Sequence, residues 1–486
     1  MNLKSSLKET LASNWAIPLL LFSIGFLWKL FFISHRDICL DEPFTIFHAQ
    51  QSISHILALP AQGEPNPPLF MLLLHFWIKL FGIGVTAVRM LPLIFNSLTV
   101  VFIYLTGKRF FNFWAGLIAS GMFLLSNFHF FHGLEVRTYS LLSLVTASSL
   151  YFYLRLIKEP GNVKMLISLV LSNLAMVYSH YFGWFVIFMQ FIAGLLYLKE
   201  KQVLKSLLIA LGITFLAYLP FFLILIRQFL KSGQGTWIEP PGSTTEYFYQ
   251  LDLLLNHKEV LNALVWIFAT GVGFMIYKKS WRAVPKELLV LFVWWFIPYT
   301  IMFLVSFKMP VFITRYLLFN SVGIYLFVAA AMAGLFNRHK ILVPLAGIVV
   351  IALMANRMRI LPDHFSFREV KNATGFAKTN YQAGSAIIIY PYWDNLGFAY
   401  YFDNSVFQDV AHFDSRLAEQ QIYPVWGLGK VKSIVEETSP QKIIYYLNGP
   451  PPGDDAGIFQ YLSDQYKMAD SSFYPQSFTI AIFERK

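Results

Sequence analysis

The first polar loop of the chain contains a dense acidic group. The run Arg36-Asp37-Ile38-Cys39-Leu40-Asp41-Glu42-Pro43 directly follows a long apolar stretch. Asp41 and Glu42 are adjacent, so on a helix their side chains would point about 100° apart and could meet different partners. One of them could act as general base on a hydroxyl nucleophile. The alternative is that Asp41, Glu42 and Pro43 only begin and cap a helix, where carboxylates favour the dipole.

Further polar clusters stand at the ends of later apolar runs. They are His129 to Arg137 with His132 and Glu135, Ser179-His180-Tyr181, Trp237 with Glu239, and Lys308 through Arg315 and Tyr316. Cations at helix ends beside a bilayer make a site for the phosphate of a lipid whose chains stay in the membrane. Each cluster alone also has a structural reading. Glu135 and Arg137 could pair locally, His180 could be a satisfied helix-end residue, and Arg315 could merely anchor a span at the headgroups.

The composition around these clusters is that of a membrane protein. Hydrophobic residues make up 56% of the chain and charged residues only 13%. About eleven apolar runs are long enough to cross a bilayer. They lie near 14–34, 86–106, 113–131, 138–154, 165–180, 182–198, 204–226, 259–277, 287–306, 316–336 and 341–356. No small-residue cleavage pattern follows the first run, so we expect it to be a retained helix.

The formal net charge of +11 does not indicate nucleic acid, because the basic residues stand at the ends of the apolar runs, where they act as topology signals. With eleven spans, one side receives short, strongly basic loops and is predicted to be cytoplasmic, together with the N-terminus. The other side receives the region 36–85, the loops 230–258 and 307–315, and the tail. The weakest step is Ser179-His180-Tyr181, because merging the runs around it would invert everything downstream.

Few ionisable residues fall inside the spans. Lys29, Arg89 and Arg227 lie near the predicted outer ends, where long side chains are expected to snorkel to water. Within 36–85, the stretches 44–59 and 68–81 are predicted to be helices along the outer interface, the second alternatively a shallow re-entrant helix. Cys39 is the only cysteine, so no intrachain disulfide and no cysteine-based metal cluster can form.

From about residue 361 the composition becomes that of a water-soluble domain. Strands are predicted at 385–390, 442–447 and 478–483, and helices at 367–379, 395–402 and 458–466. The predicted organisation is therefore an α-helical polytopic membrane domain over 1–360 and a small α/β domain over 361–486 on the outer face of the cell membrane. No phosphate-binding loop, dinucleotide fingerprint or zinc spacing appears, so neither a cofactor nor a metal is expected.

At these motifs the chain resembles the GT-C glycosyltransferases, specifically the dolichyl-phosphate-mannose protein mannosyltransferase-like family that includes the bacterial aminoarabinose transferases. The resemblance is carried by Asp41-Glu42, Asn66-Pro67-Pro68-Leu69-Phe70, Glu135-Val136-Arg137-Thr138-Tyr139-Ser140, Ser179-His180-Tyr181 and Arg315-Tyr316-Leu317-Leu318-Phe319. It implies transfer of a sugar from a polyprenyl-phosphate carrier to an acceptor on the outer face.

The resemblance also assigns roles. Asp41 matches the acidic residue taken as catalytic base, and Glu42 its neighbour in the acidic pair. Asn66 stands where the family usually has lysine or histidine before Pro67-Pro68, which removes one expected phosphate or acceptor contact. The other residues expected to bind donor phosphate or substrate are Glu64, Glu135, Arg137, His180, Tyr181, Lys308 and Arg315.

The expected mechanism is one displacement, and one displacement predicts inversion. Asp41 accepts the proton of an acceptor hydroxyl while Arg137 and Arg315 neutralise the departing lipid phosphate. Two other classes remain open: a transporter or flippase, supported only by the many spans, and a polysaccharide polymerase or ligase. The first would need internal repeats or buried charges. The second would be expected to gather its reactive groups in one large outer loop.

Overall fold

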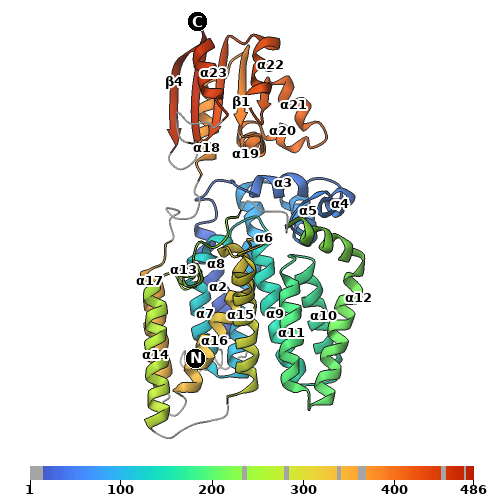
Figure 1. Cartoon of the computed structure of the whole chain (residues 1–486), viewed down its shortest axis with the longest axis vertical. Helices are drawn as coiled ribbons and strands as arrows, with labels where there is room; N and C mark the ends of the chain where they lie inside the picture. Colours follow the sequence, from blue (N-terminus) through green and yellow to red (C-terminus); the bar gives the residue numbers. More distant parts are fainter. Residues whose placement is uncertain are drawn as a thin grey trace, which may run out of the picture. The chain divides into compact units, whose positions relative to one another are not determined.

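The chain forms two compact units that interleave along the sequence. The computed structural model describes residues 15–232, 238–277, 284–336, 341–359, 368–449, 456–474 and 478–486. We call Met1–Phe31, Leu57–Leu73 and Arg89–Ile360 the helical unit, and Phe32–Ile56, Leu74–Val88 and Leu361–Lys486 the mixed unit. Both can be followed in Figure 1, where the mixed unit contains the strands.

The helical unit is a bundle of apolar helices. Wholly or in part it contains α2 (Ala16–Phe31), α4 (Ile53–Gln62), α5 (Leu69–Phe81), α6 (Val85–Phe110), α7 (Phe113–Leu124), α8 (Asn127–His132), α9 (Tyr139–Lys158), α10 (Val163–Val177), α11 (Gly183–Gly194), α12 (Lys201–Ser232), α13 (Thr245–Leu254), α14 (Lys258–Tyr277), α15 (Lys286–Val305), α16 (Leu318–Leu335) and α17 (Leu342–Asn356). A short 3₁₀ turn, η1 (Leu195–Tyr197), extends α11, and another, η2 (Thr314–Leu317), precedes α16.

These helices are those of a multi-pass membrane protein. Among the described residues, six helices are long and apolar enough to cross a bilayer: α6, α9, α12, α14, α15, and α16 with η2. Six shorter apolar helices accompany them: α2, α5, α7, α10, α11 with η1, and α17. All of these except α5 coincide with predicted spans, and α5 is the stretch predicted to lie along the interface. The count of eleven crossings and their sidedness stay predictions.

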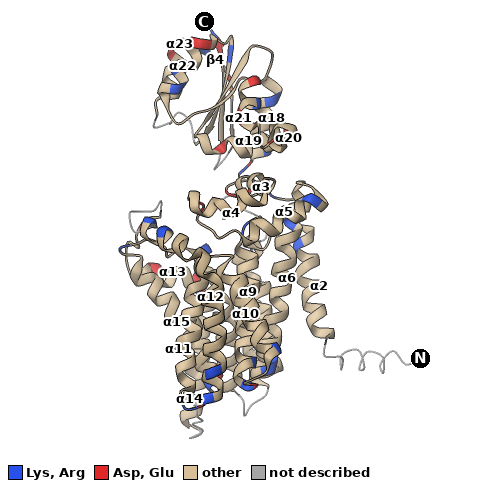
Figure 2. Ribbon diagram, turned by 90° about the vertical axis from the view of Figure 1, so that its right-hand side faces the viewer, with Lys and Arg blue, Asp and Glu red and all other residues tan. Residues whose placement is uncertain are grey.

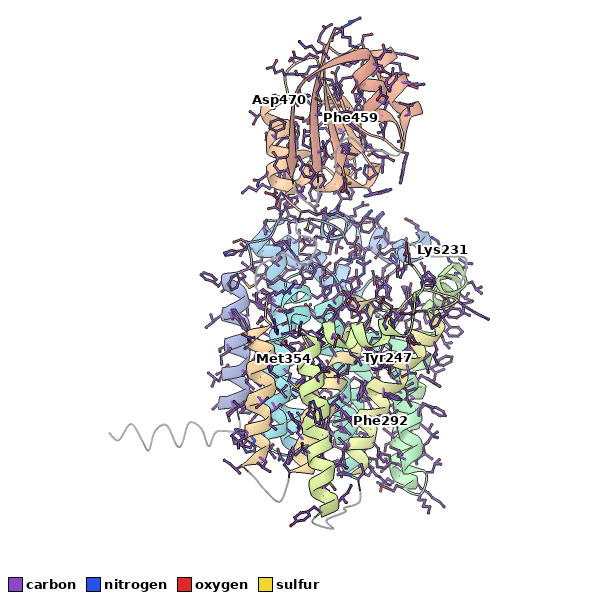
Figure 3. All side chains as sticks on the ribbon, turned by 60° about the vertical axis from the view of Figure 1, so that its left-hand side comes forward. Lys231, Tyr247, Phe292, Met354, Phe459 and Asp470 are labelled. Carbon is purple, nitrogen blue, oxygen red and sulfur yellow. The ribbon has the colours of Figure 1, made fainter. Side chains whose placement is uncertain are left out.

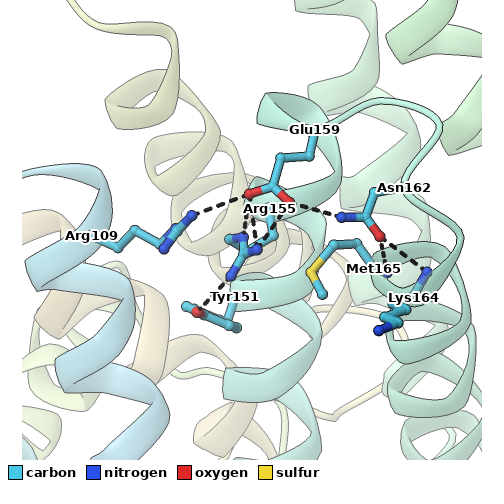
Figure 4. Close-up of polar contacts among 7 residues, drawn as sticks. All are labelled: Arg109, Tyr151, Arg155, Glu159, Asn162, Lys164 and Met165. Carbon is cyan, nitrogen blue, oxygen red and sulfur yellow. Dashed lines mark hydrogen bonds and ion pairs between the residues drawn. The ribbon is translucent and has the colours of Figure 1, made fainter. Parts of the chain in front are cut away.

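One end of the bundle is rich in Lys and Arg, and Figure 4 shows polar contacts among some of the residues there. Glu159, just after α9, binds Arg155 at 2.9 Å and Arg109 at 3.1 Å, while Asn162 donates to it at 2.9 Å. Lys286, at the start of α15, pairs with Glu200 before α12 at 2.7 Å. We call this the basic end. It gathers the helix ends that carry the predicted cytoplasmic loops, whereas most of each helix between the ends is free of charge (Figure 2).

The helices α10 and α11 are separate, as predicted. The break lies at Ser179-His180-Tyr181, because α10 ends at Val177 and α11 begins at Gly183. A buried polar network fastens both helices to α9: the Asn173 amide donates to Gln190 at 2.9 Å, and Gln190 donates to Ser149 at 2.7 Å. Each polar group of this network meets a partner inside the apolar bundle, which fixes how the three helices pack.

Two predicted snorkelling cations are instead buried. Lys29 and Arg89 are each only 1% exposed, whereas Arg227 is exposed. The Lys29 ammonium donates to the side-chain oxygen of Asn96, and Asn96 donates to the carbonyl of His129 at 3.3 Å. The prediction was wrong for Lys29 because α6 supplies an amide partner that hydropathy alone does not reveal.

The mixed unit is built around a five-stranded sheet. Its strands are β1 (Ser385–Tyr390), β2 (Ile422–Pro424), β3 (Lys442–Asn448), β4 (Tyr466–Tyr474) and β5 (Phe478–Arg485), in the order β2-β1-β3-β5-β4. Its helices are α3 (Glu42–Ala49), α18 (Val370–Asn380), α19 (Asn395–Phe402), α20 (Asn404–Gln408), α21 (Phe413–Glu419), α22 (Leu428–Thr438) and α23 (Ile458–Gln465). β1 pairs in parallel with β2 and β3, and β5 pairs antiparallel with β3 and β4.

The first loop of the chain packs into this unit. The Phe47 ring of α3 lies 4.9 Å from the ring of Phe413, edge to face. The Tyr400 hydroxyl donates to the carbonyl of Ile83 at 2.7 Å, and the backbone N–H of Ile38 donates to the Tyr401 hydroxyl at 2.6 Å. The segments 32–56 and 74–88 therefore pack with the tail domain.

Candidate active site

Asp41 stands at a strained turn in the mixed unit. Leu40, directly before it, has a φ of +56°, a left-handed conformation that a branched residue rarely adopts. Asp41 is the N-cap residue of α3 and is followed by the expected proline, yet its carboxylate makes no capping hydrogen bond. Asp41, Glu42 and Pro43 therefore begin a helix, as the structural alternative expected, although the Asp41 side chain adds no capping hydrogen bond to it.

Glu42 has a different environment from Asp41. Its side chain is 1% exposed, lies 3.7 Å from the Arg36 guanidinium, and accepts the backbone N–H of Cys39 at 3.3 Å. The carboxylate therefore spans the turn that contains Leu40 and Asp41. This geometry suits a positioning residue that holds the loop rather than a group that contacts the reacting atoms.

Replacing Glu42 by glutamine is therefore expected to lower the free energy of unfolding by about 2 kcal/mol. The substitution removes the buried carboxylate charge that lies beside the Arg36 guanidinium and accepts the Cys39 N–H. Thermal unfolding of the purified protein in detergent measures this loss. Arg36→Gln removes the other partner of the pair. If the two side chains interact, the double variant should lose less unfolding free energy than the sum of the two single variants. A Glu42→Gln protein of unchanged stability but without activity would instead make Glu42 catalytic.

A second group of predicted residues meets in the helical unit. A guanidinium nitrogen of Arg137, just before α9, lies 3.8 Å from a carboxylate oxygen of Glu64, and both side chains are buried. The Asn66 amide donates to the same carboxylate at 3.0 Å. Gln228, near the end of α12, donates to the Glu64 carbonyl at 3.2 Å. Asn66 stands where the family usually has lysine or histidine, and its hydrogen bond orients the Glu64 carboxylate that lies beside Arg137.

The loop between α10 and α11 is fastened to the same place. The Thr138 hydroxyl donates to the carbonyl of Ser179 at 2.9 Å, and the backbone N–H of Leu69 donates to the carbonyl of Tyr178 at 3.0 Å. The α9 end that carries Arg137 is opposite the end at Glu159, and the helix between them is about 30 Å long at 1.5 Å per residue. This group therefore lies about one bilayer core away from the basic end.

His180 in this loop is buried and neutral. Burial, together with the nearby guanidinium groups of Arg137 and Arg315, lowers the pKa of its imidazole to about 3. The Phe182 N–H donates to Nδ1 at 3.2 Å, so the proton of the neutral ring is assigned to Nε2. His180 can thus donate a hydrogen bond from Nε2 to an anion while the imidazole stays neutral.

Tyr181 adds a second donor. Burial raises the pKa of its phenol above the usual value, and the nearby Tyr218 hydroxyl and Glu64 carboxylate add to this effect. The hydroxyl therefore keeps its proton. It is buried and makes no hydrogen bond to any residue that the structure describes, which leaves a donor for a bound group.

The segment that contains Arg315 is held by contacts with α13. Gln250 on α13 accepts the Thr314 hydroxyl at 2.8 Å. Tyr247, labelled in Figure 3, packs its ring against Tyr299 at 4.8 Å and stacks on Phe312 at 6.3 Å. These contacts hold the segment that precedes Arg315. We call Glu64, Asn66, Arg137, His180, Tyr181 and Arg315 the arginine cluster.

Four other residues of the predicted polar clusters lie elsewhere or outside the described residues. The Glu135 carboxylate binds Nδ1 of His132 at 2.6 Å, and the Arg137 backbone N–H donates to the Glu135 carbonyl at 2.7 Å. Lys308 is exposed, and among the described residues no side-chain contact joins it to the arginine cluster. Trp237 lies outside the described residues, and Glu239 is exposed.

Comparisons with known proteins agree with this picture. Residues 65–226, which include most of the arginine cluster, match the family model described as dolichyl-phosphate-mannose-protein mannosyltransferase. An uncharacterised protein of Methanocaldococcus jannaschii is 33% identical over 93 residues, 19% of this chain. The match covers 47% of that relative, so the chain spans about half the length of the curated relative that it matches.

Solved structures extend the likeness to the whole chain. ArnT from Cupriavidus metallidurans, bound to undecaprenyl phosphate, aligns over 97% of this chain and 98% of its own with a TM-score of 0.59 at 12% identity. The same protein in the apo state aligns with a TM-score of 0.51 at 11% identity. The chain has the GT-C fold of membrane glycosyltransferases. Within that class, the expected resemblance to the dolichyl-phosphate-mannose-protein mannosyltransferase family is confirmed.

Proposed function

We propose that the protein is a membrane glycosyltransferase that moves a sugar from a polyprenyl-phosphate donor to an acceptor on the non-cytoplasmic face. The observation that carries the proposal is the arginine cluster: two guanidinium groups from different parts of the bundle act on one buried, neutral histidine. Such a set of fixed cations and neutral donors suits a phosphate ester. The ArnT relative was solved with undecaprenyl phosphate bound, which supports a donor of this class.

In the proposed mechanism the lipid phosphate is the leaving group. Asp41 takes the proton of an acceptor hydroxyl, the hydroxyl oxygen bonds to the anomeric carbon, and the bond from that carbon to the phosphate oxygen breaks. Arg137 and Arg315 stabilise the charge that grows on the phosphate, while His180 and Tyr181 donate to its oxygens. One displacement inverts the anomeric centre.

Reconstitution in proteoliposomes tests the proposal. The protein is supplied with undecaprenyl-phosphate sugars that carry a radiolabelled hexose or pentose, together with an envelope extract as the source of acceptors. We expect released undecaprenyl phosphate and label on an acceptor, and NMR of the product gives the anomeric configuration. A flippase would move the donor lipid across the bilayer without releasing undecaprenyl phosphate. Intact donor after transbilayer movement would therefore overturn the transferase assignment.

A further inference from the structure

Three aromatic side chains gather on the surface of the mixed unit. Tyr392 and Trp393 follow β1, and Trp426 follows β2. The rings of Tyr392 and Trp426 are stacked at 5.1 Å with an interplanar angle of 8°, and the Trp393 ring lies 5.5 Å from that of Trp426. Trp393 is 62% exposed and Trp426 67% exposed. We call these three residues the aromatic platform.

The platform lies where α/β sheets bind ligands. β1 and β2 are parallel neighbours, so their carboxyl ends meet at one edge of the sheet. Loops beyond the carboxyl ends of parallel strands are the usual ligand sites of such sheets. Two large indole rings that stay exposed there, and that pack on each other and on Tyr392 instead of in the core, indicate a surface that a ligand covers.

A small polar recess adjoins the platform. Trp393 lines it together with Asp394 and Arg368 from the tail domain and with Leu40 and Pro43 from the first loop. The residues that flank Asp41 and Glu42 in the sequence thus form part of its wall. The recess is only large enough for a group of about the size of a water molecule, such as a hydroxyl.

The polar groups of the recess are arranged to hold such a hydroxyl. The Asp394 carboxylate accepts the Asn448 amide at 2.7 Å and keeps lone pairs for a further donor. Burial raises the pKa of Asp394 to about 6, although the Asn448 hydrogen bond and the Arg368 charge oppose this shift. At neutral pH the carboxyl group is therefore mostly ionised, and the carboxylate can accept a strong hydrogen bond from a hydroxyl group.

We infer that the aromatic platform and the recess hold a sugar ring of the acceptor, so that the acceptor is a saccharide. The C–H edge of a sugar packs on the electron-rich face of an indole, and one of its hydroxyls enters the recess beside the Asp41 turn. An anionic lipid surface fits less well, because Asp394 follows Trp393 directly and a second carboxylate, Asp414, adds its charge to the burial that raises the pKa of Tyr392. This inference rests on the proposed function for calling the saccharide an acceptor.

A binding measurement without donor tests the inference separately from transfer. The full-length protein in detergent is titrated with neutral disaccharides of glucose, galactose, mannose and N-acetylglucosamine, followed by tryptophan fluorescence and saturation-transfer NMR. We expect binding of at least one disaccharide in the millimolar range, weakened about tenfold or more by Trp426→Ala or Asp394→Ala. Phe473→Ala removes an exposed aromatic of β4 outside the platform and should leave binding unchanged.

Three results would overturn the inference. One is that the wild-type protein binds none of the disaccharides, and another is that Trp426→Ala binds as well as the wild type. The third uses nanodiscs of phosphatidylethanolamine and phosphatidylglycerol with brominated chains: if Trp426 accounts for most of the bromine quenching, the platform is a membrane anchor. If the protein binds no disaccharide but consumes the donor normally, the transferase proposal stands and the saccharide inference fails. If it binds a disaccharide but consumes no donor, only the transferase proposal is contradicted.

Discussion

An Asp41→Asn protein is expected to lose sugar transfer by about 10²- to 10⁴-fold while keeping its fold, which is the usual contribution of a positioned general base. Asparagine has nearly the same shape as aspartate but cannot accept the proton of the attacking hydroxyl. Because the Asp41 side chain makes no capping hydrogen bond, the change removes no cap from α3. The measurement is the rate at which labelled undecaprenyl-phosphate sugar is consumed in proteoliposomes, beside thermal unfolding of the same preparation.

Asp37 provides a matched control for this result. It lies in the same acidic loop, and its carboxylate accepts the backbone N–H of Lys371 in the first turn of α18 at 2.9 Å. Asp37→Asn keeps an oxygen acceptor at that position, so transfer should stay within a few-fold of the wild-type rate. Equal activity of the Asp41→Asn and wild-type proteins would remove Asp41 as the base. Equal losses in both variants would show that the loop responds to any change of charge.

The positions of the helix ends could be predicted because hydropathy and charge act locally along the chain. Each apolar run became a helix, and the basic residues that mark their ends meet in ion pairs such as Lys286 with Glu200. The break at Ser179-His180-Tyr181, the least secure step of the topology, is present. It is held by hydrogen bonds from Thr138 and Leu69, which no sequence window around the break contains.

The partners inside the arginine cluster could not be predicted for the same reason. Arg137 lies beside Glu64, which is 73 residues away in the sequence, and the Glu135 carboxylate binds His132. Packing of α4, α9 and α12 decides these pairs, and the sequence offers only the residue types. Lys29 shows the same limit, since its burial depends on the amide of Asn96 from another helix. A rule based on local sequence therefore placed Lys29 in water, which was wrong, and could not identify His132 as a partner of Glu135.

The sheet of the mixed unit illustrates a second limit. The strands β1, β3 and β5 are nearly continuous apolar runs with buried interiors, and these were predicted. β4 was missed because it is an edge strand whose residues are mostly exposed and polar, so neither hydrophobicity nor alternation marks it. β2 has only three residues. Elements that bury little leave little pattern in the sequence.

An Arg137→Gln protein is expected to use the donor about 10²- to 10³-fold less efficiently, because a fixed cation no longer faces the charge that develops on the phosphate. Arg137→Lys restores charge but not the fork of donors, so it should recover only part of the loss. The values of kcat and KM for the undecaprenyl-phosphate sugar separate the effects. A role in the transition state lowers kcat, and a role in ground-state binding alone raises KM.

The Glu64 carboxylate makes this prediction sharper, since it lies 3.8 Å from Arg137. If the pair only supports the fold, Glu64→Gln and Arg137→Gln should destabilise the protein equally and should reduce transfer in proportion to that loss. If Arg137 faces the donor phosphate, its replacement impairs transfer far more than the replacement of Glu64 at similar stability. Lys308→Gln removes an exposed cation from the stretch that leads to Arg315 and should change transfer by less than about twofold. A stable Arg137→Gln protein with unchanged kcat and KM would assign the arginine cluster to the architecture of the bundle rather than to the donor.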